Sequence, residues 1–126
     1  TIAYVHCDDE GDGHLEPPER MREQLRTFTT ATGSHYRLLP LPMAEPIFFE
    51  GARLPATYAN FLIINGAVLV PFYETKKDAQ AAEILSAAFP ERDIVGIDCR
   101  VLIRQHGSLH CVTMQYPSGV LRKEAR

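Results

Sequence analysis

A chain of 126 residues with 45% hydrophobic side chains is long enough to build one domain with a hydrophobic core. Its formal net charge of −3, without a basic stripe, argues against a nucleic-acid partner. The sequence has no apolar run of about 18 residues and no segment with the layout of a signal peptide, so we expect neither a membrane span nor secretion.

The first part of the chain predicts a strand, a helix and a second strand. We expect the strands at residues 1–7 and 36–41, where apolar residues predominate. The helix opens at two prolines, which its first turn tolerates, and ends before Gly33. An apolar stripe at helical spacing marks its inner face and consists of Met21, Leu25 and Phe28. Residues 43–55 then form a proline-bearing connection.

The clearest structural signal is a β-hairpin in the middle of the chain. Two apolar runs, residues 58–64 and 67–72, flank Asn65-Gly66, a dipeptide well suited to a tight hairpin turn. Because both arms are apolar throughout, we expect both faces of the hairpin to be covered.

A second helix and a further strand follow the hairpin. Thr75 and Asp78 have the spacing of a capping box, and Pro90 ends the helix. Residues 93–98 predict another buried strand. The inner face of the helix contains Ala81, Leu85 and Ala88, with Ile84 beside them. The order predicts an α/β fold with a repeated strand–strand–helix–strand module.

The stretch from Gly107 to residue 115 reads as a small loop that leads into a short strand. The small residues Gly107 and Ser108 allow backbone N–H groups to approach a ligand. Because side chains alternate between the two faces of a strand, Cys111 would lie on one face and His110 on the other. We expect the His110 side chain to pack behind the sheet. Any base that activates the Cys111 thiol must then come from elsewhere in the fold.

The cysteines and histidines do not have the spacing of a metal site. Three cysteines are an odd number without a paired spacing, which favours a reducing cytoplasm over a disulfide framework. No CxxC or HxxxH-type pair has a matching second half, so we expect no metal ion. The residues considered are Cys7, Cys99, Cys111, His6, His14, His106 and His110. Of these, we expect Cys7 and Cys99 in the core.

The acidic residues near two of the predicted strands have structural interpretations. Asp8, Asp9 and Glu10 belong to a polar turn that we expect to be solvated. Asp98 is expected to fix the turn that follows its strand rather than to contact a substrate.

Three blocks of sequence together resemble the agmatine deiminase and bacterial-type peptidylarginine deiminase family. They occur in the family's order and are Leu-Pro-Ala-Thr-Tyr-Ala-Asn-Phe at 54–61, Val-Gly-Ile-Asp-Cys-Arg at 95–100 and His-Gly-Ser-Leu-His-Cys-Val-Thr-Met-Gln at 106–115. The resemblance covers residues 1–117 and implies a five-bladed α/β propeller of strand–strand–helix–strand modules around a central substrate site. It makes this chain the C-terminal part of a longer protein.

The resemblance divides the chain, as a single partial domain, into four parts. These are the end of one module at 1–42, one complete module at 56–98, the nucleophile loop and strand at 99–116, and a tail at 117–126.

The chemistry that the resemblance implies is hydrolysis of a guanidine to a ureido product and ammonia. A cysteine thiolate attacks the guanidinium carbon, ammonia leaves, and water resolves a covalent thiouronium intermediate. Carboxylates hold the planar cation through paired hydrogen bonds, and a histidine transfers protons. The implied substrate is agmatine or an arginine-type guanidinium such as peptidyl arginine, and no metal or organic cofactor is implied.

The family's site residues can be carried over where this sequence matches. Cys111 matches the nucleophile, Asn60 an asparagine that lines the active site, and Gly107 the last glycine of the loop before the cysteine. His106 stands where many members have glycine, and we expect it to border the substrate pocket or cap the loop. The resemblance therefore implies that Cys111 is catalytic and that Asn60, Gly107 and His106 bind the substrate.

The family's catalytic histidine lies in a Gly-His-x-Asp motif that this chain does not match. Gly13-His14 is followed by Leu15-Glu16, so the role is not carried over to His14. We expect the general acid/base before residue 1, and therefore expect this segment alone to be inactive.

Two other interpretations remain open. The chain could be a non-catalytic interaction domain that binds another protein, or a second copy of itself as a homodimer, through an open sheet edge. It could also belong to an enzyme that transfers an amidino group, because transfer and hydrolysis share the same covalent intermediate.

Overall fold

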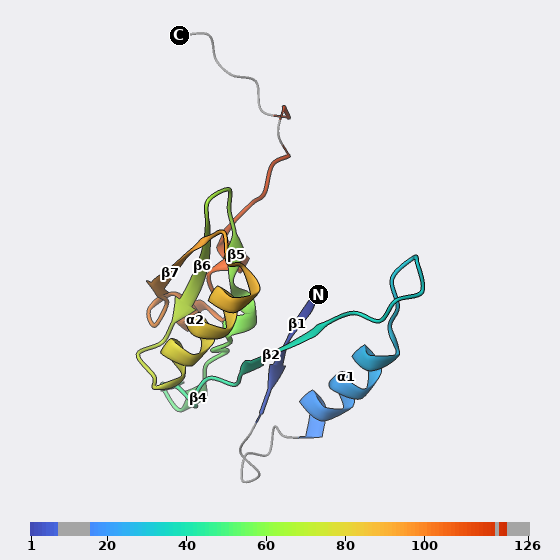
Figure 1. The fold of residues 1–126 in the computed structure, drawn as a ribbon. Helices are drawn as coiled ribbons and strands as arrows, with labels where there is room; N and C mark the ends of the chain where they lie inside the picture. Colours follow the sequence, from blue (N-terminus) through green and yellow to red (C-terminus); the bar gives the residue numbers. More distant parts are fainter. Residues whose placement is uncertain (8–15, 118, 121–126) are drawn as a thin grey trace, which may run out of the picture.

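The structure, a computed structural model, describes residues 1–7, 16–117 and 119–120 (Figure 1). The predicted strand, helix and strand are present as β1 (Ile2–His6), α1 (Glu16–Thr27) and β2 (Leu38–Pro42). β1 and β2 pair in parallel, with the intervening helix as the crossover. The polar turn with Asp8, Asp9 and Glu10, and His14, lie outside the described residues.

The first helix is shorter than predicted. It ends at Thr27, six residues before Gly33, and Phe28 lies beyond its end with half of its surface exposed. Met21 is also exposed, so the apolar stripe is not covered by the part of the chain that the structure describes.

The second unit contains the predicted hairpin, helix and strand. Its elements are β5 (Leu62–Ile63), β6 (Ala67–Phe72), α2 (Lys77–Ala88) and β7 (Asp93–Asp98). β5 pairs antiparallel with β6, and β6 pairs in parallel with β7, so the three strands form one sheet in that order. The first hairpin arm is shorter than predicted, because Tyr58–Asn60 forms the 3₁₀ turn η1.

The hydrophobic core lies between the sheet, β2 and α2. Its side chains without exposed surface include Leu41 from β2, Val68 and Val70 from β6, and Leu85 from α2. Burial of each such side chain contributes about 1.5–3 kcal/mol, which makes this cluster the main source of stability. Ala81 and Leu85 of the predicted inner helix face are fully buried.

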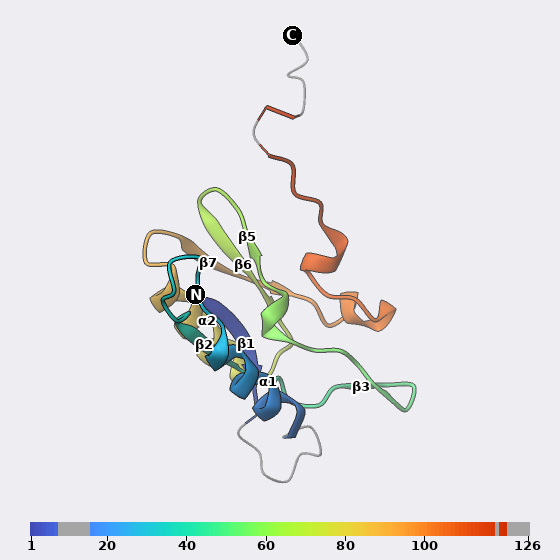
Figure 2. The same ribbon diagram turned by 90° about the vertical axis from the view of Figure 1, so that its right-hand side faces the viewer.

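The prediction that both faces of the hairpin are covered is confirmed for β6, none of whose residues is exposed, but is wrong for the first arm; the prediction of a buried strand at residues 93–98 is wrong for β7. Ile63, Ile64 and Val95 are each more than a third exposed. α2 covers one face of the β5–β6–β7 sheet, whereas the loops from residue 99 to 113 cover only part of the other (Figures 1 and 2).

The predicted capping box does not form as such, because α2 begins at Lys77 and its N-cap residue Lys76 makes no side-chain capping bond; Asp78 is instead the centre of a larger hydrogen-bond network. Asp78 is buried and accepts backbone N–H groups from Tyr73, Glu74 and Thr75 at 2.8–3.3 Å. The Thr75 hydroxyl accepts the N–H of Lys77 at 3.2 Å. The carboxylate thus fixes the tight connection between β6 and α2.

The connection between the two units contains a small hairpin of β3 (Phe48–Phe49) and β4 (Ala52–Arg53). This hairpin projects from the body of the molecule (Figure 2). The guanidinium of Arg104 lies 4.5 Å from the centroid of the Phe49 ring, so a cation–π contact joins the hairpin to the loops before Cys111.

The prediction of a strand around Cys111 is wrong. Residues after β7 form two 3₁₀ turns, η2 (Leu102–Gln105) and η3 (His110–Val112). The N–H of Cys111 donates to the carbonyl oxygen of Ser108 at 3.1 Å, and that of Thr113 to His110 at 3.1 Å. These local bonds occupy the groups that a strand would offer to a neighbour.

Among the described helices, none has the length and apolar character needed to cross a membrane.

Candidate functional site

Two short turns from distant parts of the chain meet at Asn60 and Cys111. Asn60 is the last residue of η1, and its Nδ2 donates to Sγ of Cys111 at 3.2 Å. Its Oδ1 accepts the backbone N–H of His110 at 2.6 Å. One amide side chain therefore contacts both the thiol and the backbone beside it, across 51 positions of sequence.

The turn that carries Asn60 is held firmly at its start and its centre. Thr57 caps η1, since its Oγ1 accepts the N–H of Ala59 at 3.2 Å. Tyr58 has no exposed surface, and its hydroxyl donates to Oδ1 of Asp78 at 2.6 Å. Burial, followed by the hydrogen bond to Asp78, raises the pKa of Tyr58 well above its usual value, which keeps this donor protonated.

The Cys111 thiol is exposed, and its pKa is lowered from the usual value of 9.0. The largest cause is a backbone hydrogen bond from Ser108, followed by the side-chain hydrogen bond from Asn60. Both favour the thiolate because a negatively charged sulfur is a better acceptor than a neutral one. The chain thus presents a thiol that ionises more easily than an ordinary cysteine.

The other two cysteines contrast with Cys111. Cys7 and Cys99 are both buried, which confirms the prediction that they belong to the core. Burial raises the pKa of the Cys99 thiol, because the apolar surroundings disfavour the charged form.

Gly107 lies directly against the cysteine. A Cβ atom added at Gly107 would stand 3.2 Å from Cβ of Cys111 and 3.9 Å from its sulfur. That separation is tighter than ordinary van der Waals contact, so a side chain here would press on the reactive residue. The absence of a side chain lets the loop fold closely around the thiol.

The two histidines of this loop are both exposed. His106 has a left-handed backbone with φ of 65° and borders a pocket of about 390 Å³, where Arg53 supplies a positive charge. The prediction that His110 packs behind a sheet is wrong, because η3 is a turn. The backbone N–H of His110 donates to Oδ1 of Asn60.

Charged partners for a guanidinium are not assembled around Cys111 within the described residues. The hydrogen bonds that Cys111 and Asn60 make in this part of the chain involve no carboxylate. Asp98 accepts the N–H of Arg100 at 3.0 Å, which confirms its predicted role in the turn. It also holds the Arg100 guanidinium with both oxygens, and Glu74 pairs with the same group.

No cluster of three or more potential metal ligands occurs among the described residues.

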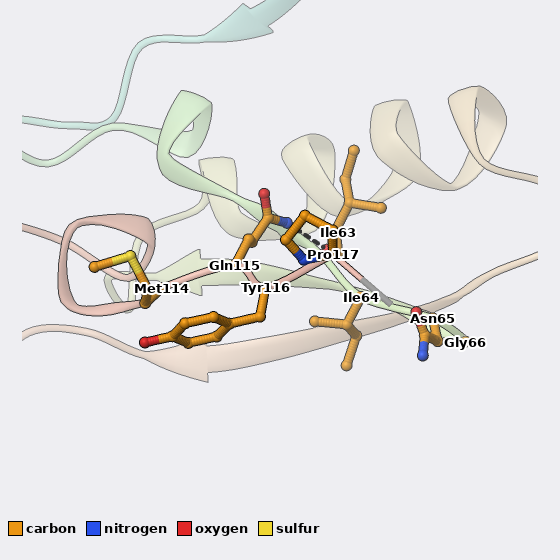
Figure 3. Close-up of a pocket in the computed structure, with 8 residues that line it drawn as sticks. All are labelled: Ile63, Ile64, Asn65, Gly66, Met114, Gln115, Tyr116 and Pro117. Atoms are coloured by element: carbon orange, nitrogen blue, oxygen red, sulfur yellow. Dashed lines mark hydrogen bonds between the residues drawn. The ribbon is translucent and has the colours of Figure 1, made fainter. Parts of the chain in front are cut away.

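A larger groove lies away from this chemistry. It has a volume of about 670 Å³ between the hairpin tip and residues 114–117, where Nε2 of Gln115 donates to the carbonyl oxygen of Ile63 at 3.2 Å (Figure 3). The lining residues are uncharged and are Ile63, Ile64, Asn65, Gly66, Met114, Gln115, Tyr116 and Pro117. No cysteine or histidine lines this groove, so the candidate site stays at Cys111.

Two residues beside the site were not found by sequence reasoning. Ser108 is 2% exposed and bonds through its hydroxyl to the equally buried Tyr73. Ser108 was interpreted only as a small loop residue, and Tyr73 carried no signal because it simply follows an apolar strand.

Comparison with known proteins gives consistent matches. A model of the Porphyromonas-type peptidyl-arginine deiminase family matches residues 1–117. A solved structure from Porphyromonas gingivalis, provisionally named an arginine deiminase, is 54% identical, with a TM-score of 0.93 over 96% of this chain and 36% of its own. The agmatine deiminase of C. jejuni is 48% identical, with a TM-score of 0.79 over 87% of this chain and 33% of its own.

A curated relative from Marinomonas sp. (strain MWYL1), provisionally named agmatine deiminase, is 32% identical over 93% of this chain. The match covers 36% of that relative. The chain therefore spans little more than a third of the length of the curated relatives it matches.

Proposed function

Because the chain belongs to the Porphyromonas-type peptidyl-arginine deiminase family, we propose that it forms the nucleophile-bearing part of a guanidine hydrolase. The family match over residues 1–117 confirms the resemblance drawn from the three sequence blocks. The proposed reaction converts agmatine, or an arginine-type guanidinium, to the ureido product and ammonia. The names of the C. jejuni and Marinomonas relatives support agmatine as the substrate to test first.

One observation carries the proposal, namely the exposed Cys111 thiol in contact with Asn60. The thiol has a lowered pKa, and its hydrogen bond to Nδ2 of Asn60 is 3.2 Å long. An exposed, easily ionised thiol is the form of cysteine that acts as a nucleophile, whereas buried thiols such as Cys99 are inert.

The proposed mechanism has two steps, and Cys111 is restored at the end. In the first, the thiolate attacks the guanidinium carbon and a C–S bond forms; one nitrogen takes a proton from the general acid and leaves as ammonia as its C–N bond breaks. In the second, water attacks the same carbon and gives up both of its protons, one to the general base and one to the solvent, and the C–S bond breaks to release the ureido product and the thiolate. Asn60 donates to the sulfur at the beginning and the end of the cycle, when the sulfur is an anion.

The rest of the site is proposed to come from outside the described residues. We place the general acid/base histidine and the guanidinium-binding carboxylates there, in the remaining blades of a five-bladed propeller. Residues 1–126 alone are then expected to be inactive. Gly107 and His106 are proposed to border the bound guanidinium, and no metal or organic cofactor is part of the reaction. We further propose a reducing, cytoplasmic location, because the odd number of three cysteines does not suit a disulfide framework.

The test is a ureido-product assay on the complete natural protein, with agmatine, free arginine and a peptidyl arginine as separate substrates. We expect turnover with at least one substrate and its loss in Cys111→Ala, while the matched Cys99→Ala variant keeps its activity. No turnover by the wild-type protein with any of them would contradict the proposal and favour a binding module. Turnover that requires an added amine acceptor would indicate amidino transfer instead.

A further inference from the structure

The side chain of Tyr73 lies at the centre of a buried hydrogen-bond network. Tyr73 directly follows β6 and is 2% exposed. Its hydroxyl donates to the carbonyl oxygen of Thr57 at 3.0 Å and accepts the N–H of Thr57 at 3.1 Å. It also lies 2.8 Å from Oγ of Ser108. A phenol has a single proton, which Thr57 accepts, so the Ser108 hydroxyl donates to the oxygen of Tyr73.

Both partners of Tyr73 lead directly to the candidate site. Thr57 caps η1, whose last residue is Asn60. The carbonyl oxygen of Ser108 accepts the N–H of Cys111 at 3.1 Å, at the start of η3. Apart from the contacts of Asn60 itself, hydrogen bonds therefore connect η1 to the Cys111 loop through the hydroxyl of Tyr73.

We propose that Tyr73 is a positioning residue, whose buried hydroxyl fixes the distance between η1 and the Cys111 loop and so keeps Asn60 Nδ2 in contact with the Cys111 sulfur. The consequence for turnover rests on the proposed function, whereas the consequence for the thiol does not. The Tyr73 hydroxyl bonds to Thr57 and Ser108 and acts on the sulfur through these two partners.

A second buried tyrosine provides an internal comparison. Tyr58 belongs to η1 and its ring centroid lies 5.6 Å from that of Tyr73. Its hydroxyl bonds to Thr75 and Asp78, so it joins η1 to the start of α2 rather than to the Cys111 loop.

Burial raises the pKa of Tyr73, so its hydroxyl stays protonated and the bond to Thr57 persists over the working pH range.

The test compares Tyr73→Phe with the matched control Tyr58→Phe in the complete natural protein. The measurement is the rate of iodoacetamide alkylation at Cys111, located by mass spectrometry of its peptide and followed from about pH 6 to about pH 10. For Tyr73→Phe we expect a rate at pH 7 about three- to tenfold below wild type, because the hydrogen bond from Asn60 to the sulfur is weakened, and a midpoint displaced to higher pH. For Tyr58→Phe we expect a midpoint close to that of the wild type.

A variant on the other side of the link keeps the test valid if Tyr73→Phe folds poorly. Ser108→Ala removes the same hydrogen bond and leaves Tyr73 bonded to Thr57. It should displace the midpoint in the same direction, and the double variant should displace it no further than the larger single effect. An unchanged midpoint in Tyr73→Phe and Ser108→Ala, or an equal displacement in Tyr58→Phe, would overturn the proposal.

The ureido assay separates this proposal from the proposed function. A protein that forms no ureido product, yet shows the displaced midpoint only in the Tyr73 and Ser108 variants, would refute the hydrolase and support the positioning role. Normal turnover and unchanged midpoints in both variants would support the hydrolase and refute the positioning role.

Discussion

At the scale of single residues, the three cysteine thiols differ in their burial and in the hydrogen bonds they receive, and this difference defines the site. Cys7 and Cys99 are buried among apolar side chains, and Cys111 is exposed and receives hydrogen bonds. Because the thiolate is the reactive form, the environment of each sulfur decides its chemistry.

The first prediction concerns the pH dependence of Cys111. Its pKa is lowered in the folded protein, so alkylation should reach half of its maximum at a lower pH than in a short unstructured peptide that contains the same cysteine. In the same experiment Cys99, whose pKa is raised by burial, should remain unmodified until the protein is unfolded. Equal rates at the two peptides in the native protein would contradict this prediction.

The second prediction separates the two functions of Asn60. In Asn60→Ala the sulfur and the N–H of His110 both lose a partner, and the alkylation midpoint should rise. Asn60→Asp keeps an acceptor for His110 but places a negative charge beside the sulfur, so its midpoint should rise further than that of the alanine variant. The same titration checks both, and a lower midpoint in Asn60→Asp would rule out the assigned contacts.

At the residue scale, the sequence motif located Cys111 and Asn60, but it could not supply their supporting contacts. The links of Ser108 and Tyr73 are 35 positions apart in sequence and depend on the final fold. Predicting them required knowing that residues 107–113 fold as a turn and that Tyr73 lies beneath it.

At the scale of elements, local signals predicted most of what surrounds the site. Asn65-Gly66 and the apolar runs beside it gave the β5–β6 hairpin, and the Thr75–Asp78 spacing gave the start of α2. The prediction of a strand at Cys111 was wrong. β-Branched side chains such as Val112 have only a weak preference for an extended backbone, and the local hydrogen bonds of the turn outweigh it.

The third prediction concerns Asp78 as the centre that joins η1, β6 and α2. Asp78→Ala would leave the buried N–H of Tyr73 and the buried hydroxyl of Tyr58 without this acceptor, so we expect the free energy of unfolding to fall by roughly 2–4 kcal/mol. Urea denaturation measures the change, with the exposed Asp93→Ala as the matched control. A loss as small as that of the control would show that the carboxylate is not structurally required.

The fourth prediction concerns the close approach of β6 and β7. A Cβ added at Gly96 would lie 2.2 Å from a ring carbon of Phe72, which forces the ring to move. Gly96→Ala should cost roughly 1–3 kcal/mol of unfolding free energy, whereas Gly66→Ala, which meets no atom within 4 Å, should cost much less. Similar melting temperatures for the two variants would contradict this packing.

At the scale of the whole molecule, the exposed apolar side chains and the incomplete charge complement of the site have a common explanation. Ile63, Ile64 and Val95 are exposed within a chain that spans little more than a third of the relatives it matches. Sequence patterns alone marked these residues as buried, because periodicity reports burial in the complete protein and not in one segment of it. We therefore propose that parts of the complete protein outside this chain cover these faces and supply the groups that hold the guanidinium.

The central claim is that Cys111 forms a covalent bond to the guanidinium carbon. The most direct measurement is mass spectrometry of the Cys111 peptide after the complete natural protein is acid-quenched during turnover of agmatine. We predict an adduct whose added mass equals agmatine less ammonia, present on this peptide and absent without substrate. Continued ureido formation by Cys111→Ser, with no adduct on the wild-type peptide, would contradict the account.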